Sequence, residues 1–351
     1  MTAPVSLPEA FRLQARACAG LGSPFMARLL PLLADRLHPG TALTDRLFGW
    51  PRDLTARGDA VPLRLAGGLH ALVLSGQDDA LAAAYADWAR LSDDALVGAV
   101  LEAMARHQAF LLDWLDNAPQ TNEVRRAAAL IAAGHWLADR FGLPLVLSEL
   151  GASAGLNLLW DRYALEIDGH RYGPDAPVLT LTPDWDGPLP PQTAPEVTER
   201  RGVDLNPLAP GADRLRLLAY LWADQSDRLA RTAAALDAAA QRPPPVDRGD
   251  AAGWAEARLA EPRPGALHLV YHTIAAQYFP AETRARLAAA LQAAGARATP
   301  EAPLAHLAME ADEATPGAGL TLQTWPGGRT HALGRVDFHG RWLRWTPPAG
   351  E

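Results

Sequence analysis

The segment Leu145–Arg162 reads Leu-Val-Leu-Ser-Glu-Leu-Gly-Ala-Ser-Ala-Gly-Leu-Asn-Leu-Leu-Trp-Asp-Arg, and it decides the expected fold. Leu145–Leu147 is a short apolar run of the kind found in buried strands, and Leu156–Arg162 has helical character. Between them lies a turn of small residues that begins with an acid, Glu149–Gly155. In open α/β sheets the ligand lies outside the carboxyl ends of the strands, so we expect a ligand at this turn.

The composition of the turn favours close approach of a ligand to the backbone. Gly151 can adopt positive φ without a Cβ penalty, and the following helix would direct the positive end of its dipole at the site. We therefore predict that Glu149, Gly151, Ser153, Gly155 and Asn157 bind a cofactor. The alternative is a tight strand–helix turn that has only a packing role.

Working outward, the next expected strands also end in polar residues. Asp204 ends the second, Asp250 follows the third and His272 ends the fourth. Carboxyl ends of parallel strands meet at one rim, where an acid after the second strand can bind ribose hydroxyls. A single acid at a strand end is usually only solvated, so the prediction rests on the whole set.

The pattern along the chain predicts two regions. Residues 1–141 have helical periodicity, clearest as one helix over Asp93–Leu115, and we expect a helical cap there, with the site between the two regions. Residues 142–351 alternate strands and helices, which indicates a Rossmann-like α/β domain with a mostly parallel sheet. A β-hairpin insertion around 163–195 explains the long gap before Asp204, and strands at 320–325 and 335–345 would close the edge as an antiparallel pair.

The composition limits the function classes. The 351 residues are 49% hydrophobic and 21% charged with a net charge of −8, which fits a folded protein and argues against a nucleic-acid surface. All 32 basic residues are arginine, which excludes Schiff-base lysines and the phosphate-binding lysine of P-loops.

Other sequence features favour a soluble cytoplasmic protein. Cys18 is the single cysteine, so no disulfide can form within the chain. Met1–Pro4 lacks the basic start of a signal peptide, and no charge-free apolar run reaches the length of a membrane span. The ten histidines include no His-Glu-x-x-His pattern and no cysteine–histidine cluster, so we expect no metal. The sequence leaves the oligomeric state open.

The order of acids resembles that of class I S-adenosylmethionine-dependent methyltransferases, which have an acid before a glycine-rich first loop and acids after the second and third strands. Their seven-stranded sheet also ends in an antiparallel pair. The resemblance implies S-adenosylmethionine as cofactor and a small molecule as methyl acceptor. It implies that Glu149 holds the amino-acid part of the cofactor, Asp204 the ribose and Asp250 the adenine edge. The polar residue after the fourth strand, His272, would face the substrate, and the pKa usual for histidine suits proton transfer.

The chain as a whole is similar to the bacterial family designated domain of unknown function 2332. The segments that carry the similarity are Gln120–Val124, Glu149–Leu159 with Asp161–Tyr163, Gly202–Pro207 and Val270–Thr273. This similarity implies that Asn122 and Glu123 belong to the same site, where they would orient or deprotonate the acceptor together with His272. The alternative is that they begin a helix, with Thr121 or Asn122 as its N-cap.

Two other functions stay open. Gly151–Gly155 also matches Gly-x-Ser-x-Gly, the nucleophile turn of α/β-hydrolases, with Ser153 followed by Asp204 or Asp250 and then a histidine. Against it, that turn normally follows several strands, whereas residues 1–140 predict helices. The turn also has fewer glycines than a typical cofactor loop, which leaves a non-catalytic binding protein as the third class.

Overall fold

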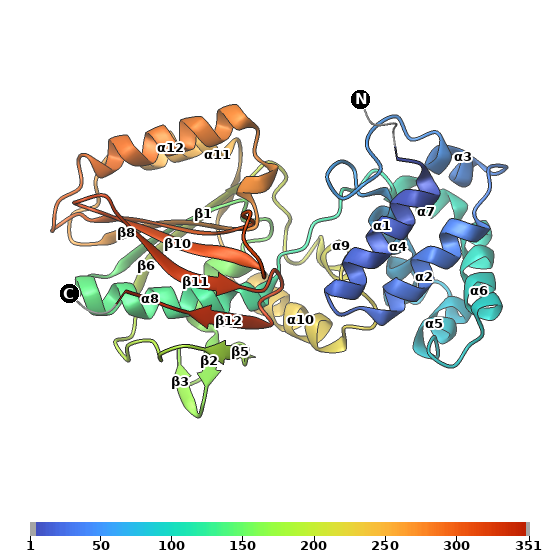
Figure 1. Ribbon diagram of the computed structural model, residues 1–351, viewed down its shortest axis with the longest axis horizontal. Helices are drawn as coiled ribbons and strands as arrows, with labels where there is room; N and C mark the ends of the chain where they lie inside the picture. Colours follow the sequence, from blue (N-terminus) through green and yellow to red (C-terminus); the bar gives the residue numbers. More distant parts are fainter. Residues whose placement is uncertain (1–4, 349–351) are drawn as a thin grey trace. The chain divides into compact units, whose positions relative to one another are not determined.

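The computed structural model describes residues 5–348, which form two compact units (Figure 1). Unit 1 holds the chain up to Thr121 together with Ala212–Ala233, and unit 2 holds Asn122–Gly211 together with the chain from Ala234 onward. Met1–Pro4, on which the argument against a signal peptide rests, lies outside the described residues.

The boundary between the units differs from the expected one at 141/142. Helix α8, Ala127–Phe141, belongs to unit 2, and residues 212–233 return to unit 1. The reason is the packing of α8, which is buried on almost every side. A Cβ at Gly134 would lie 2.4 Å from Cη2 of Trp160, so this glycine lets the indole ring rest directly on the helix.

Unit 1 is helical, as the sequence predicts. Its helices are α1 (Leu7–Gly20), α2 (Pro24–Arg36), α3 (Ala42–Phe48), α4 (Val61–Leu74), α5 (Asp79–Ala86), α6 (Asp93–Arg106), α7 (Gln108–Trp114), α9 (Arg214–Ala219) and the first part of α10 (Ser226–Gln241). The apolar faces of α1 to α7 share one core in which leucines predominate, and Ala219 of α9 packs in a smaller cluster with Ala71 and Trp114. Among the described residues, no single helix is long and apolar enough to cross a membrane. The bent pair α6 and α7 together has the length and composition of a membrane span, and nothing beyond length and composition supports that reading.

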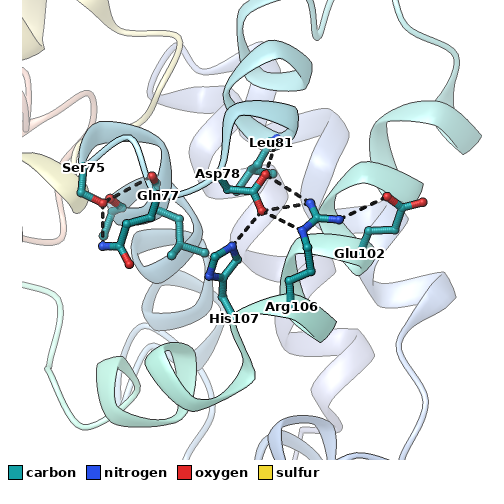
Figure 2. Close-up of polar contacts among 9 residues, drawn as sticks. Ser75, Gln77, Asp78, Leu81, Glu102, Arg106 and His107 are labelled. Atoms are coloured by element: carbon teal, nitrogen blue, oxygen red, sulfur yellow. Dashed lines mark hydrogen bonds and ion pairs between the residues drawn. The ribbon is translucent and has the colours of Figure 1, made fainter.

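The expected single helix over 93–115 is wrong: α6 and α7 are separate helices bent by 87° at His107. Figure 2 shows the buried carboxylate of Asp78 at this bend. It accepts hydrogen bonds from Nη2 of Arg106 (2.9 Å), from the N–H of Leu81 (2.9 Å) and from Nε2 of His107 (3.0 Å). Asp78 therefore caps α5 and fixes the α6–α7 bend with one side chain.

Asp78→Ala is expected to lower the free energy of unfolding by about 1–2 kcal/mol, because α5 loses its N-cap and Arg106 loses its buried partner. Burial acts to raise the pKa of Asp78, but the Leu81 N–H and the Arg106 guanidinium outweigh it and lower the pKa. The difference in stability between wild type and Asp78→Ala should therefore be complete at neutral pH and should shrink as the pH falls through this lowered pKa. Urea unfolding of both proteins at pH 7 and pH 3 checks this.

The control is Asp79→Ala, which removes the neighbouring exposed carboxylate from the first turn of the same helix. It should change stability by less than about 0.5 kcal/mol. Equal losses in the two variants would contradict a fixing role for Asp78.

Unit 2 contains a nine-stranded sheet in the order β5-β12-β11-β10-β9-β8-β1-β6-β7. Its strands are β1 (Leu145–Leu150), β5 (Asp184–Asp186), β6 (Val197–Asp204), β7 (Val246–Arg248), β8 (Leu267–Thr273), β9 (Leu304–Glu310), β10 (Ala318–Trp325), β11 (Arg329–Val336) and β12 (Trp342–Trp345). Strands β7-β6-β1-β8-β9 are all parallel. In chain order they lie as 3-2-1-4-5, the order of doubly wound nucleotide-binding folds. The order reverses between β1 and β8, where such folds bind ligands.

Beyond the parallel part, the pairs from β9 to β12 are antiparallel, as expected, but β5 pairs parallel with β12 at the edge, and the last expected strand is divided. Strands β10 and β11 pair antiparallel, and the expected strand 335–345 is split between β11 and β12. The reason is the Asp337 carboxylate, which accepts hydrogen bonds from the N–H of His339 (3.0 Å) and of Arg341 (3.2 Å) and so stabilises a turn.

The expected insertion is present as a small separate sheet. Strands β2 (Ala164–Ile167) and β3 (His170–Tyr172) form a hairpin, and β4 (Thr180–Leu181) joins β2 in parallel.

Helices α11 (Ala251–Arg258) and α12 (Ala281–Gly295) lie on one face of the large sheet and α8 lies on the other (Figure 1). Three short 3-10 helices, η1 (Val124–Arg126), η2 (Leu156–Arg162) and η3 (Ala276–Tyr278), complete the described elements of the unit.

Candidate functional site

The turn after β1 has three residues in the left-handed region. The φ angles are 71° at Gly151, 54° at Ser153 and 72° at Gly155. Such a φ is costly for serine, so surrounding contacts must hold the turn in place.

These contacts come from the adjacent strand and from the segment before α8. The N–H groups of Gly151 and Ala152 donate to the carbonyl of Val203 at 2.9 and 3.0 Å. The N–H of Ser153 donates to Oδ2 of Asp204 at 2.8 Å. The N–H of Leu156 donates to Oδ1 of Asn122 at 2.8 Å, so the structure brings Asn122 to the turn. Asn122 is buried, and its contact is with the backbone of the turn.

The two glycines are required by the protein's own packing. A Cβ at Gly151 would lie 2.6 Å from Cβ of Ala275, and one at Gly155 would lie 2.6 Å from Cγ of Pro244. The sequence predicts that Gly151 lets a ligand approach the backbone closely, but side chains of unit 2 fill the space next to both glycines.

The helix after the turn is weaker than expected. Residues 156–162 form the 3-10 helix η2, which has a non-helical residue at Leu159 (φ −101°, ψ 15°). Seven residues in a broken 3-10 helix do not sum to a useful dipole, so the expected helix-terminus contribution to ligand binding is lost.

Three buried polar atoms of the turn region have no hydrogen-bond partner within residues 5–348. They are Oε2 of Glu149, Oγ of Ser153 and Oδ1 of Asn157. Burial of Glu149 raises the pKa of its carboxyl well above the usual value, the nearby Asp204 carboxylate raises it further, and Arg126 acts in the opposite direction. Glu149 therefore favours its neutral form, and a cation beside it would reverse that preference.

The surroundings of Glu149 include residues that the sequence did not single out. Tyr271 lies beside Glu149 in register, and its hydroxyl donates to the carbonyl of Asn157 at 3.0 Å. Arg126 donates from Nη1 to the carbonyl of Thr273 at 3.0 Å. Arg126 precedes α8 and Tyr271 lies inside a buried strand, so neither position carries a local signal of function.

Glu123 lies at the start of η1. Its side-chain Oε1 accepts a hydrogen bond from the N–H of Arg125 at 3.1 Å, so Glu123 itself is the N-cap of this helix. The N-cap is thus neither Thr121 nor Asn122. The carbonyl of Glu123 accepts from Nδ2 of Asn157 at 3.3 Å, which joins this segment to the turn.

The two aspartates after β6 and β7 are both engaged by the protein. Asp204 accepts the N–H of Ser153 through Oδ2 and that of Asn206 through Oδ1, each at 2.8 Å. Asp250 is the N-cap of α11, where Oδ2 accepts the N–H of Gly253 at 2.9 Å and Oδ1 accepts the hydroxyl of Thr283 at 3.0 Å. Asp204 thus holds the turn, and Asp250 holds the start of a helix.

His272 is buried in a polar cluster with Glu310 and His306. Its Nδ1 lies 2.7 Å from Oε1 of Glu310, and its Nε2 lies 3.1 Å from Nε2 of His306. Burial, with a smaller effect of His272, lowers the pKa of His306 to about 3. Burial acts to raise the pKa of Glu310, but the hydrogen bond from His272 and the N–H groups of Ala275 and Ala276 outweigh it and lower the pKa.

The predicted residues therefore fall on two faces of the sheet. Glu149 and Tyr271 share one face, and because side chains alternate along a strand, His272 lies on the other. Val270, two residues before His272, packs with α11 and α12, which identifies that second face. The structure brings Asn122, Glu123 and Asn157 to the turn, whereas His272 and Asp250 lie on the side of α11 and α12.

No curated protein and no solved structure matches the chain. One family model, described as "Uncharacterized protein conserved in bacteria (DUF2332)", matches residues 8–345. This match covers nearly all of the 351 residues, and it includes both units and the whole of the candidate site. The chain therefore belongs to the bacterial family DUF2332.

Proposed function

We propose that unit 2 binds S-adenosylmethionine at the carboxyl ends of β1 and β6, and that the protein transfers its methyl group to a small molecule. The sheet gives the strongest support. Its parallel part has the strand order of nucleotide-binding folds, and the turn Glu149–Gly155 leaves the central strand β1 beside the point where this order reverses.

The polar atoms of the turn support a fit to this cofactor in two places. The carboxyl of Glu149 has one buried oxygen without a partner in the described chain, which suits the ammonium group of the cofactor's amino-acid part. Each carboxylate oxygen of Asp204 accepts one N–H and has capacity for a second donor, which suits two ribose hydroxyls. Asp250 gives less support as a ligand of the adenine edge, because its oxygens already serve α11 and Thr283.

When bound, the cofactor would supply an activated methyl group, which leaves by in-line displacement. Such a reaction depends on positioning and on the exclusion of water. In this chain Asn122 and Asp204 fix the turn, and the left-handed Ser153 is held between them. The positioning of the acceptor by Asn122 or Glu123 stays a prediction from the sequence.

For His272 the geometry supports a positioning role. Glu310 accepts hydrogen bonds from His272 and from the N–H groups of Ala275 and Ala276. Ala275 in turn fills the space beside Gly151. His272 thus acts on the turn through Glu310 and Ala275, and both of its ring nitrogens are already engaged.

The serine hydrolase alternative receives less support. Ser153 has the positive φ of a nucleophile turn, but across the described chain its Oγ has no hydrogen-bond partner, so no histidine lies within reach to activate it. A binding protein without turnover remains the second candidate, because the residues predicted to act on the acceptor are engaged by the protein itself: Asn122 with Leu156, Glu123 with Arg125, and His272 with Glu310 and His306.

S-adenosylmethionine and S-adenosylhomocysteine are expected to raise the melting temperature. A ligand specific for the folded state stabilises it by about 2.7 kcal/mol at one hundred times its dissociation constant. Differential scanning fluorimetry and titration calorimetry measure the two effects. Absence of both heat and a shift at millimolar concentration would refute the proposal, and binding without methyl transfer to any acceptor would leave the non-catalytic candidate.

Ser153→Ala separates the enzyme classes. In a cofactor site the variant loses at most one hydrogen bond, so cofactor affinity should fall by no more than about tenfold. A hydrolase would lose several orders of magnitude in rate. Labelling of the wild-type protein by a fluorophosphonate probe, with no labelling of the variant, would favour the hydrolase.

A further inference from the structure

Arg126 begins the helix that covers the face of the sheet on which Glu149 lies. Leu150 packs with α11 and α12, so its neighbour Glu149 in β1 faces the other side of the sheet. Helix α8 covers that other side, and Arg126 is its N-cap residue (Figure 1). Arg126 is half-buried, so part of its side chain is accessible to a ligand at this rim.

Two hydrogen bonds fix the guanidinium of Arg126 at the carboxyl end of β8. Nη1 donates to the carbonyl of Thr273 at 3.0 Å, and Nε donates to the carbonyl of Phe338 at 2.9 Å. Thr273 ends β8 and lies two residues past Tyr271, the partner of Glu149 in register. Adjacent strands are about 4.8 Å apart and rise about 3.3 Å per residue, so the Cα atoms of Thr273 and Glu149 are separated by roughly 8 Å.

The segment that carries Arg126 is held from two sides. Asn122 and Glu123, in the same segment, bind the turn and the residues after it through the hydrogen bonds described above. On the opposite side, a Cβ at Gly340 would lie 2.7 Å from the carbonyl carbon of Arg125, so the two backbones are in direct contact. A ligand would therefore meet the Arg126 side chain already in position, which lowers the entropy cost of binding.

The charge of Arg126 acts on the candidate site and suits an anionic group. Burial and then the Asp204 carboxylate raise the pKa of Glu149, whereas Arg126 acts in the opposite direction. The two carbonyls that bind Arg126 carry no formal charge, and they use two of the five N–H donors of the guanidinium. A planar guanidinium matches the geometry of a carboxylate, which takes two donors.

We infer that Arg126 binds the carboxylate of the cofactor's amino-acid part, beside the ammonium group at Glu149. This role of Arg126 rests on the proposed function and adds to it a residue that recognises the carboxylate. The ammonium nitrogen and the carboxylate carbon of an α-amino acid lie about 2.5 Å apart. Hydrogen bonds of about 2.8 Å on either side separate the two binding groups by roughly 6–8 Å, which fits the spacing between Glu149 and the end of β8.

S-adenosylmethionine and decarboxylated S-adenosylmethionine test this role, because they differ only in the carboxylate. By titration calorimetry, the wild type should bind the decarboxylated compound about ten- to hundredfold more weakly, since a charge-assisted pair is lost. Arg126→Met should weaken S-adenosylmethionine by a similar factor and should not weaken the decarboxylated compound. Retained binding of the decarboxylated compound also shows that the site of the variant is folded.

Arg125→Met is the matched control, because it removes the neighbouring charge of the same 3-10 helix. It should change the affinity for S-adenosylmethionine by less than about twofold, since a charge without direct contact to the ligand is largely screened by salt. An equal loss in Arg125→Met and Arg126→Met would overturn the inference and leave the proposed function standing.

The two compounds on the wild type decide the question even if Arg126→Met does not fold. Equal affinity of the wild type for both compounds would overturn the carboxylate role alone. Binding of neither compound would overturn the proposed function together with this role of Arg126.

Discussion

Glu149→Gln is expected to stabilise the ligand-free protein, and the gain should grow as the pH rises. The carboxyl is buried, one of its oxygens has no partner in the described part of the chain, and burial raises its pKa well above the usual value. Above the pKa of the unfolded chain, folding holds a proton that the unfolded chain would release. The stability contributed by this proton is complete below the unfolded pKa and is lost as the pH rises through the folded pKa.

The expected size follows from the same linkage. Wild-type stability should fall relative to the variant by about 1.4 kcal/mol for each pH unit between the two pKa values. Chemical unfolding of wild type and Glu149→Gln at pH 5, 6, 7 and 8 measures this difference. Glu166→Gln, at an exposed position of β2, serves as the control and should show no such trend. A constant difference between wild type and Glu149→Gln across this range would show that Glu149 is not the titrating group.

The same variant bears on the proposed function. A cationic ammonium group beside Glu149 favours the charged carboxylate, so cofactor binding by the wild type should release a proton and tighten with rising pH. Glu149→Gln should bind more weakly and without this pH dependence. Stabilisation of the variant together with unchanged cofactor affinity would support the stability argument and oppose the ligand role.

Asp204→Ala is expected to destabilise the protein by about 3 kcal/mol. Its two oxygens accept N–H groups from Ser153 and Asn206, and charge-assisted hydrogen bonds contribute roughly 1.5–3 kcal/mol each. Freed from this contact, Ser153 loses the support for its left-handed conformation. Cofactor affinity should also fall by at least about tenfold. Urea unfolding and calorimetry measure the two losses separately.

Asp204→Asn is the matched variant. It keeps one acceptor oxygen, but its NH2 group faces the other backbone N–H, so it should recover less than half of the lost stability. An unchanged melting temperature in Asp204→Ala would mean that the carboxylate is merely solvated, and the turn would then be held by Val203 and Asn122 alone.

The parallel part of the sheet was predictable because its strong signals are local. Leu145–Leu147 is a short apolar run directly after Gly142-Leu143-Pro144, which favours a buried strand, and the polar residues that end the strands mark one rim. The bend at His107 was not predictable, since helical spacing continues through it to Leu111 and Leu115. The cause is Asp78, which precedes a different helix.

The site shows the same division between local and distant causes. An acid after a strand can bind a ligand or cap the next helix, and at Asp250 the start of α11 decides the outcome. Gly151 has a positive φ, as its lack of a Cβ allows. The packing that requires glycine there comes from the side chain of Ala275, more than a hundred residues later in the chain. Arg126 and Tyr271 gain their importance from Glu149 only after folding.

The return of residues 212–233 to unit 1 affects how the protein is made. A Cβ at Gly67 of α4 would lie 2.5 Å from the ring of Tyr220, and His70 lies 2.8 Å from the carbonyl of Leu221, so this stretch covers one side of α4. On the ribosome, α4 is finished long before its cover, because residues 75–211 are synthesised in between. At translation rates of about 5–20 residues per second, this takes roughly 7–27 s. A fragment that ends at Thr121 would keep this apolar surface uncovered permanently.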